Sequence, residues 1–132
     1  GPPRVRWVVD ASSVVAYLLG QASDAERQGL LGDVYAPSLI DVEATQTLRG
    51  LVRGSKLAPA AAEQSRIELT QLGLRRYPDH SLLRRAWELR DVCTVYDALY
   101  VALAEALDAT LLTRDARLAH GVADLVSVVT SD

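Results

Sequence analysis

Short apolar runs alternate with longer amphipathic stretches along this chain. Runs rich in β-branched and aliphatic residues predict five strands, at 5–9, 34–38, 74–78, 109–113 and 124–129. Apolar residues recur at helical spacing between them, over 12–20, 24–32, 41–54, 58–73, 81–92, 95–107 and, as a short turn, 114–121. Strands that alternate with helices predict an α/β fold, a three-layer α/β/α sandwich with a mainly parallel sheet.

The helix predicted at 95–107 is apolar on nearly all sides. It carries Leu99, Val101 and Leu103 together with several alanines, and Asp97 stands in its first turn. A helix without a polar face is buried. We therefore expect it in the core or against another subunit.

Composition limits the class of protein. With 132 residues, 49% of them hydrophobic, we expect one globular domain over 1–132. Gly1-Pro2 is typical of the remnant left by removal of a tag, so residues 1–3 carry no weight. The net charge of −3 argues against a broad basic surface for nucleic acid, but site carboxylates count as negative until a metal binds them.

Several further features are informative. Thirteen of the 14 basic residues are Arg, which suits phosphate contacts and is equally typical of a GC-rich genome. The single Cys93 rules out an internal disulfide and a cysteine zinc site. Asp10 interrupts the apolar run near the N-terminus, and no 18-residue apolar stretch exists. We expect a cytoplasmic protein with no membrane contact.

Four acids are expected at one edge of the sheet. In open α/β sheets, binding sites lie beyond the carboxyl ends of the strands. Asp10 directly follows the first strand, Glu43 lies in the first turn after the second, and Asp115 follows "TLLT". Asp97 opens the apolar helix, and its place at this edge is inferred. Gathered carboxylates repel one another, and oxygen-only ligands suit Mg²⁺ or Mn²⁺.

Each acid could instead cap a helix. Acids are favoured in the first turn, and Thr94-x-x-Asp97 resembles a capping box. Thr113 could cap the turn that holds Asp115. Asp41 is expected to be the N-cap of the Glu43 helix. Two further acids are expected to be caps or solvated charges, Asp91 and Asp108.

Three blocks, "VVDASSVVAYLL", "APSLIDVEATQTLRGLVRG" and "YDALYVALAEALDATLLTRDARLA", share their order and spacing with a known family. Over residues 5–129 the sequence resembles the PIN-domain ribonucleases and, within them, the VapC-type toxins of bacterial toxin–antitoxin pairs. The resemblance implies a Mg²⁺-dependent endoribonuclease, with Mn²⁺ able to substitute. Its catalytic and metal-binding residues would be Asp10, Glu43, Asp97 and Asp115, some of them binding through water, with Thr113 orienting Asp115 or a water molecule.

The resemblance also implies partners. These are an RNA substrate, whose cleavage inhibits translation and growth, and a VapB-type antitoxin whose tail places a basic side chain among the acids. It implies a homodimer as well. Cleavage would leave a 5′ phosphate and a 3′ hydroxyl.

The remaining polar and aromatic residues receive more ordinary interpretations. Ser12 and Ser13 are expected to cap the first helix or to bind a metal-bound water. Arg114 and Arg117 flank Asp115, and either contact RNA phosphates or form a solvated face. The others are expected to be capping or surface residues (His80, His120) and core residues (Cys93, Trp7, Trp87).

Rival interpretations fit less well. A phosphohydrolase of the haloacid dehalogenase type needs Asp-x-Asp, where this chain has Ser12, and a positioned Lys, for which Lys56 is the sole candidate. A phospho-receiver domain needs an adjacent acidic pair that is missing. A PIN-fold interaction module with little catalysis is the alternative that failure to bind Mn²⁺ would favour.

Overall fold

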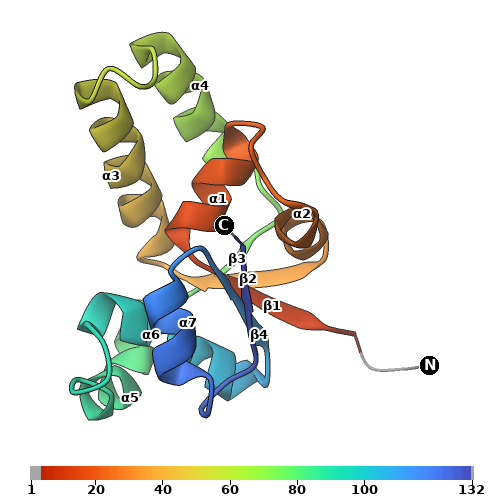
Figure 1. Ribbon diagram of the computed structural model, residues 1–132, viewed down its shortest axis with the longest axis vertical. Coiled ribbons are helices and arrows are strands. Elements are labelled where there is room, and N and C mark those ends of the chain that lie inside the picture. Colours follow the sequence, from red (N-terminus) through yellow and green to blue (C-terminus); the bar gives the residue numbers. More distant parts are fainter. Residues whose placement is uncertain (1–3, 132) are drawn as a thin grey trace.

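Five parallel strands form one sheet in the computed structural model, which describes residues 4–131 (Figure 1). Their order across the sheet is β3-β2-β1-β4-β5. The strands are β1 (Arg6–Val9), β2 (Asp33–Pro37), β3 (Arg75–Tyr77), β4 (Thr110–Thr113) and β5 (Val128–Thr130). In the central strand, Val8 pairs with Tyr35 of β2 and Leu111 of β4. The predicted α/β class is confirmed, and every neighbouring pair of strands is parallel.

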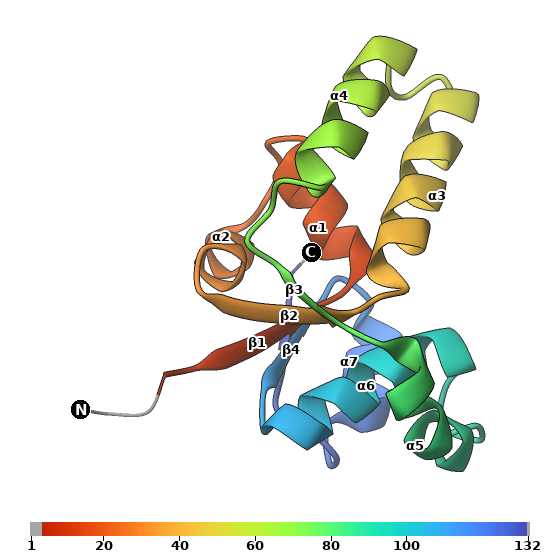
Figure 2. The same cartoon turned by 180° about the vertical axis from the view of Figure 1, so that it is seen from behind.

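Helices cover both faces of the sheet (Figures 1 and 2). One face carries α1 (Ala11–Leu18), α2 (Asp24–Leu30), α3 (Ile40–Arg53) and α4 (Pro59–Leu69). The other carries the 3-10 helix η1 (Asp79–Leu82), α5 (Leu83–Glu88), α6 (Val95–Leu107) and α7 (Ala116–Val122). The three layers therefore match the predicted sandwich. Residues 1–3, assigned to a tag remnant, lie outside the described residues.

Several predicted elements are shorter than expected. The helix predicted over 58–73 is α4, which ends at Leu69 because the amides of Thr70 and Gln71 close turns. The last strand was predicted from 124 but begins at Val128, because the amides of Leu125 and Val126 close turns onto the Val122 carbonyl. The helix predicted over 81–92 ends at Glu88, where the chain enters turns. Tight turns use the backbone groups that a longer strand or helix would need.

The apolar helix α6 is the central packing element. Its residues from Ala98 to Ala104 are all buried, and it contacts β1, β2, β4 and α5. Fully burying each of its Leu or Val side chains stabilises the fold by about 1.5–3 kcal/mol. The expected burial of α6 is thus confirmed, and the elements that bury it belong to this chain. Such packing fixes the direction of α6, and with it the position of Asp97.

The two tryptophans differ from the prediction that both lie in the core. Trp7 is 8% exposed and packs under α2, where a Cβ on Gly29 would come within 2.8 Å of Leu112. Gly29 therefore lets α2 approach the sheet closely. Trp87 is 63% exposed, so its predicted core position is wrong. Among the described helices none could cross a membrane, since the longest, α3, has 14 residues against the about 20 required.

Candidate active site

Four helices begin at the carboxyl edge of the sheet. Both views show the first turns of α1, α3, α6 and α7 drawn together there (Figures 1 and 2). Helices α1, α3 and α7 follow strands β1, β2 and β4, whereas α6 precedes β4. A helix that leads directly into a parallel strand runs antiparallel to that strand, so its first turn lies at the carboxyl edge. This explains how Asp97 joins acids that follow strands.

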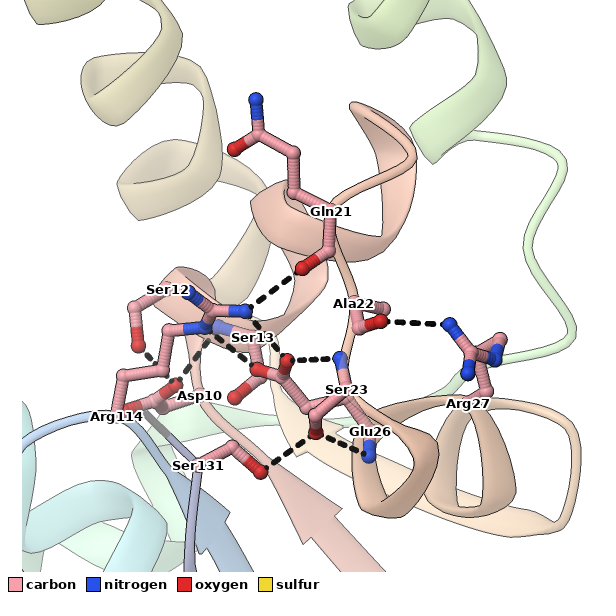
Figure 3. Close-up of polar contacts among 10 residues, drawn as sticks. All are labelled: Asp10, Ser12, Ser13, Gln21, Ala22, Ser23, Glu26, Arg27, Arg114 and Ser131. Atoms are coloured by element: carbon pink, nitrogen blue, oxygen red, sulfur yellow. Dashed lines mark hydrogen bonds and ion pairs between the residues drawn. The ribbon is translucent and has the colours of Figure 1, made fainter.

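Asp10 is the N-cap of α1. Its Oδ1 accepts from the Ser12 hydroxyl at 2.7 Å and from the Ser13 N–H at 3.2 Å (Figure 3), and its Oδ2 accepts from the Thr113 hydroxyl. The expectation that Ser12 or Ser13 caps this helix was wrong, because both donate to the acid that does. Burial nevertheless raises the pKa of Asp10, and the charge of Asp115 raises it further.

Glu43 lies in the first turn of α3 and is held by a tyrosine. The buried Tyr100 hydroxyl donates to Glu43 Oε1 at 2.6 Å. Burial raises the pKa of Glu43, the Tyr100 bond partly offsets this, and the charges of Asp97 and Asp10 raise it again. Sequence reasoning missed Tyr100. Its signal was the spacing from Asp97, because residues three apart lie on one face of a helix.

Asp97 stands in the first turn of α6. Its backbone N–H donates to the hydroxyl of Thr94, the N-cap, at 3.2 Å, which is one half of the predicted capping box. Both halves of such a box are present in α2, between Ser23 and Glu26. Burial raises the pKa of Asp97, and the nearby charges of Asp115 and Asp10 add to the rise. The charges of both acids therefore act on the Asp97 carboxyl group.

Thr113 links two of the acids. Besides donating to Asp10, its buried hydroxyl accepts from the Asp115 N–H at 3.0 Å. Asp115 caps α7 by accepting from the backbone N–H groups of Arg117 at 3.0 Å and Leu118 at 3.1 Å. Asp115 rather than Thr113 is therefore the N-cap of α7, and the Thr113 hydroxyl accepts from the backbone N–H of that cap residue.

Asp41 does not cap α3, contrary to prediction. Helix α3 begins at Ile40, and Asp41 instead forms a bidentate ion pair with Arg76, at 2.8 and 2.9 Å. At the start of this helix, Asp79 accepts a hydrogen bond from the Leu39 N–H at 3.0 Å. The charge of Asp79 also raises the pKa of Glu43. Asp79 was also missed, although it follows the third strand as Asp10 follows the first.

The arginines that flank Asp115 have different surroundings. Arg114 does not belong to a solvated face, because it pairs with the fully buried Glu26 of α2 (Figure 3). Arg117 is exposed, as are His80 and His120. The buried Glu26 is the third residue that sequence reasoning did not identify.

The acid cluster has the character of a cation site. Three acids from α1, α3 and α6 have raised pKa values, and no ion pair within residues 4–131 includes them or Asp115. Their oxygen donors suit Mg²⁺ or Mn²⁺. Within the described part of the chain, however, no three acidic, His or Cys side chains lie close enough to hold one ion together. The chemistry of the oxygen donors therefore fits such a cation, although the positions of the described side chains do not bring three of them to a single ion.

Comparison with known proteins identifies the family. The PIN domain model matches residues 7–122, so the chain belongs to the PIN-domain family. Its relatives include ribonuclease VapC1 of Mycobacterium tuberculosis, 44% identical over 117 residues (85% of this chain and 87% of the relative). Ribonuclease VapC3 of the same species is 40% identical over 89% of this chain and 88% of the relative. Within the family, the chain is therefore of the VapC ribonuclease type.

Solved structures share the fold. PAE2754 from Pyrobaculum aerophilum superposes with a TM-score of 0.68 at 24% identity, covering 98% of this chain and 93% of that one. A toxin–antitoxin complex from Klebsiella pneumoniae gives a TM-score of 0.62 at 17% identity, covering 93% and 95%. The arrangement of strands and helices is thus kept in chains whose sequences have diverged widely.

Proposed function

We propose that this chain is an endoribonuclease toxin that cleaves RNA with a divalent cation held by Asp10, Glu43, Asp97 and Asp115. One observation carries the proposal: Asp10, Glu43 and Asp97 stand on separate elements at one sheet edge, where burial and, after it, the charges of neighbouring acids raise their pKa values. Such repulsion costs stability, because folding brings the charges together. A bound cation would relieve this repulsion, and the relief would favour its binding.

The side chains have distinct tasks in this proposal. The cation, Mg²⁺ with Mn²⁺ as a substitute, supplies an activated water and stabilises charge on the phosphate. Asp10 is held rigidly by its three donors, and Glu43 by Tyr100. Thr113 fixes the spacing of Asp10 and Asp115. We expect products with a 5′ phosphate and a 3′ hydroxyl.

Mn²⁺ titration by calorimetry tests the site directly and separates the two candidate functions. We expect the wild-type protein to bind Mn²⁺ and Asp97→Asn to bind it at least about tenfold more weakly, since one charged ligand is lost. Asp91→Asn, an exposed acid near the end of the α5 segment, is the control and should bind normally. A folded wild-type protein that binds no Mn²⁺ would instead favour a PIN-fold interaction module.

An antitoxin of the VapB type is the proposed partner. Solved neighbours include the Klebsiella toxin–antitoxin complex and VapBC2 from Rickettsia felis bound to a DNA fragment from their promoter. A basic side chain from such a partner would pair well with unneutralised acids. We propose that this chain acts in the cytoplasm, because its proposed RNA substrate is found there.

A homodimer is proposed through an apolar surface on α5 and the start of α6. Leu83, Trp87, Val92 and Tyr96 are between 46% and 63% exposed. Apolar side chains gathered in this way commonly mark an interface with another protein. Light scattering should give a dimer mass for the wild type and a lower mass for Trp87→Ser; an unchanged dimer would place the interface elsewhere.

A further inference from the structure

A fully buried carboxylate lies just behind the acid cluster, on α2. Glu26 has no exposed surface, and its carboxylate accepts from Arg114 Nε at 2.8 Å and from Arg114 Nη2 at 2.6 Å (Figure 3). The Ser23 N–H donates to it at 2.9 Å. Although burial alone would raise the pKa of Glu26, these donors hold it below its ordinary value. The pair is therefore bidentate, and it joins a fully buried carboxylate to a guanidinium group whose side chain is 29% exposed.

Stability alone does not account for this pair. Removing the Glu26 charge from water costs several kcal/mol, and apolar pairs of similar volume are often as stable as a buried ion pair or more so. Helix α2 is already seated by apolar packing, with Gly29 against Trp7 and Leu112. The pair therefore needs another role, and the segment that it holds in place supplies one.

The pair holds the segment that carries two site groups. Arg114 stands between Thr113, whose hydroxyl donates to Asp10, and Asp115, whose N–H donates to Thr113. Its Nη2 also donates to the Gln21 carbonyl at 3.1 Å, between α1 and α2. Both partners of the guanidinium belong to the stretch from Gln21 to Glu26, and Figure 3 shows the Gln21 carbonyl and the Glu26 carboxylate directed at Arg114.

We propose that Glu26, acting through Arg114, is a positioning residue for the cation site. It fixes the backbone at 113–115 and thereby the places of Thr113 and Asp115. This inference rests on the proposed metal-dependent function. Residues that orient metal ligands from behind typically contribute about 10- to 100-fold to metal affinity.

The test separates positioning from stability. The double variant Glu26→Leu/Arg114→Leu replaces the ion pair with an apolar pair. We expect it to unfold without metal near the wild-type temperature, because the apolar pair offsets the loss of the ion pair and of the Ser23 capping bond, yet to bind Mn²⁺ about 10- to 100-fold more weakly by calorimetry. A purely structural pair would leave the Mn²⁺ affinity unchanged once stability is restored, and that result would overturn the proposal.

A matched control removes another bidentate pair. Arg85 donates to Glu105 at 2.8 and 3.0 Å, joining α5 to the later turns of α6. Arg85→Leu/Glu105→Leu should bind Mn²⁺ as the wild type does. An equal loss of affinity in this control would show that any lost ion pair weakens the site, and would overturn a specific role for Glu26.

A conservative variant covers the case in which the double variant does not fold. Arg114→Lys keeps the positive charge but cannot form the bidentate contact. We expect it to remain folded with weakened Mn²⁺ binding, and wild-type affinity would overturn the proposal. Failure of the proposed function appears separately, as a wild-type protein that binds no Mn²⁺, and this inference would fall with it.

Discussion

Replacing Tyr100 with Phe removes one hydroxyl and the 2.6 Å hydrogen bond to Glu43. Hydrogen bonds to charged groups contribute about 1.5–3 kcal/mol. Glu43 is only half-buried, so water replaces part of the lost bond. We expect the free energy of unfolding at pH 8 to fall by about 1–2 kcal/mol. For a chain of this length, that lowers Tm by about 4–7 °C.

The loss should depend on pH. Burial raises the pKa of Glu43 above its ordinary 4.5, and the Tyr100 bond lowers it. Tyr100→Phe therefore raises this pKa further and penalises the ionised form. As the pH falls through the folded pKa, Glu43 takes up a proton, and the bond becomes a neutral one of roughly half the strength. At pH 4 the difference in Tm between the variant and the wild type should be about half that at pH 8.

Thermal unfolding followed by circular dichroism, at both pH values and without metal, measures this effect. Tyr77→Phe is the control, because Tyr77 is 38% exposed and lies on β3, away from the proposed dimer surface. That control should change stability by less than about 0.5 kcal/mol. If Tyr100→Phe lowers Tm equally at pH 4 and pH 8, the cost comes from packing and the reasoning from an ionised Glu43 is refuted.

Three further predictions concern the acids. Asp97→Asn should raise the Tm of the metal-free protein by a few degrees at pH 7.5, because the folded state raises the pKa of Asp97 and its ionised form therefore destabilises the fold; an unchanged or lower Tm would contradict this. Asp41→Asn should cost about 1 kcal/mol in chemical denaturation, since its partly exposed pair with Arg76 is broken, and RNA cleavage should continue at the wild-type rate. Mn²⁺ affinity measured by calorimetry should fall about tenfold between pH 7.5 and pH 5, because the buried acids must lose protons to bind metal; a constant affinity would count against the site.

Elements with a strong local pattern were predictable from the sequence. Helix α6 was predicted over 95–107 and occupies Val95–Leu107, because apolar residues follow the Thr94 cap with only Asp97 and Glu105 among them. The edge position of Asp10 follows from its place directly after a buried strand. The position of Asp97 needed topology as well, since it depends on the direction in which α6 enters β4.

Contacts between distant parts of the chain were not predictable. Asp79 accepts a hydrogen bond from the Leu39 amide at the start of α3, although the two residues are 40 positions apart. Arg114 meets Glu26 across 88 positions, and no local pattern marks either as a partner of the other. Trp87 was assigned to the core by its size, but α5 leaves it outside. In each case three-dimensional proximity decided the role of a residue whose local sequence suggested another.

The most direct measurement is RNA cleavage with mapping of the new ends. Antitoxin-free protein would be incubated with total bacterial RNA and Mg²⁺, beside a chelator control and the Asp97→Asn variant. The account predicts discrete cuts that carry 5′ phosphates and that disappear in both controls. Cuts that persist with Asp97→Asn, or the absence of cuts from folded protein that binds Mn²⁺, would contradict it.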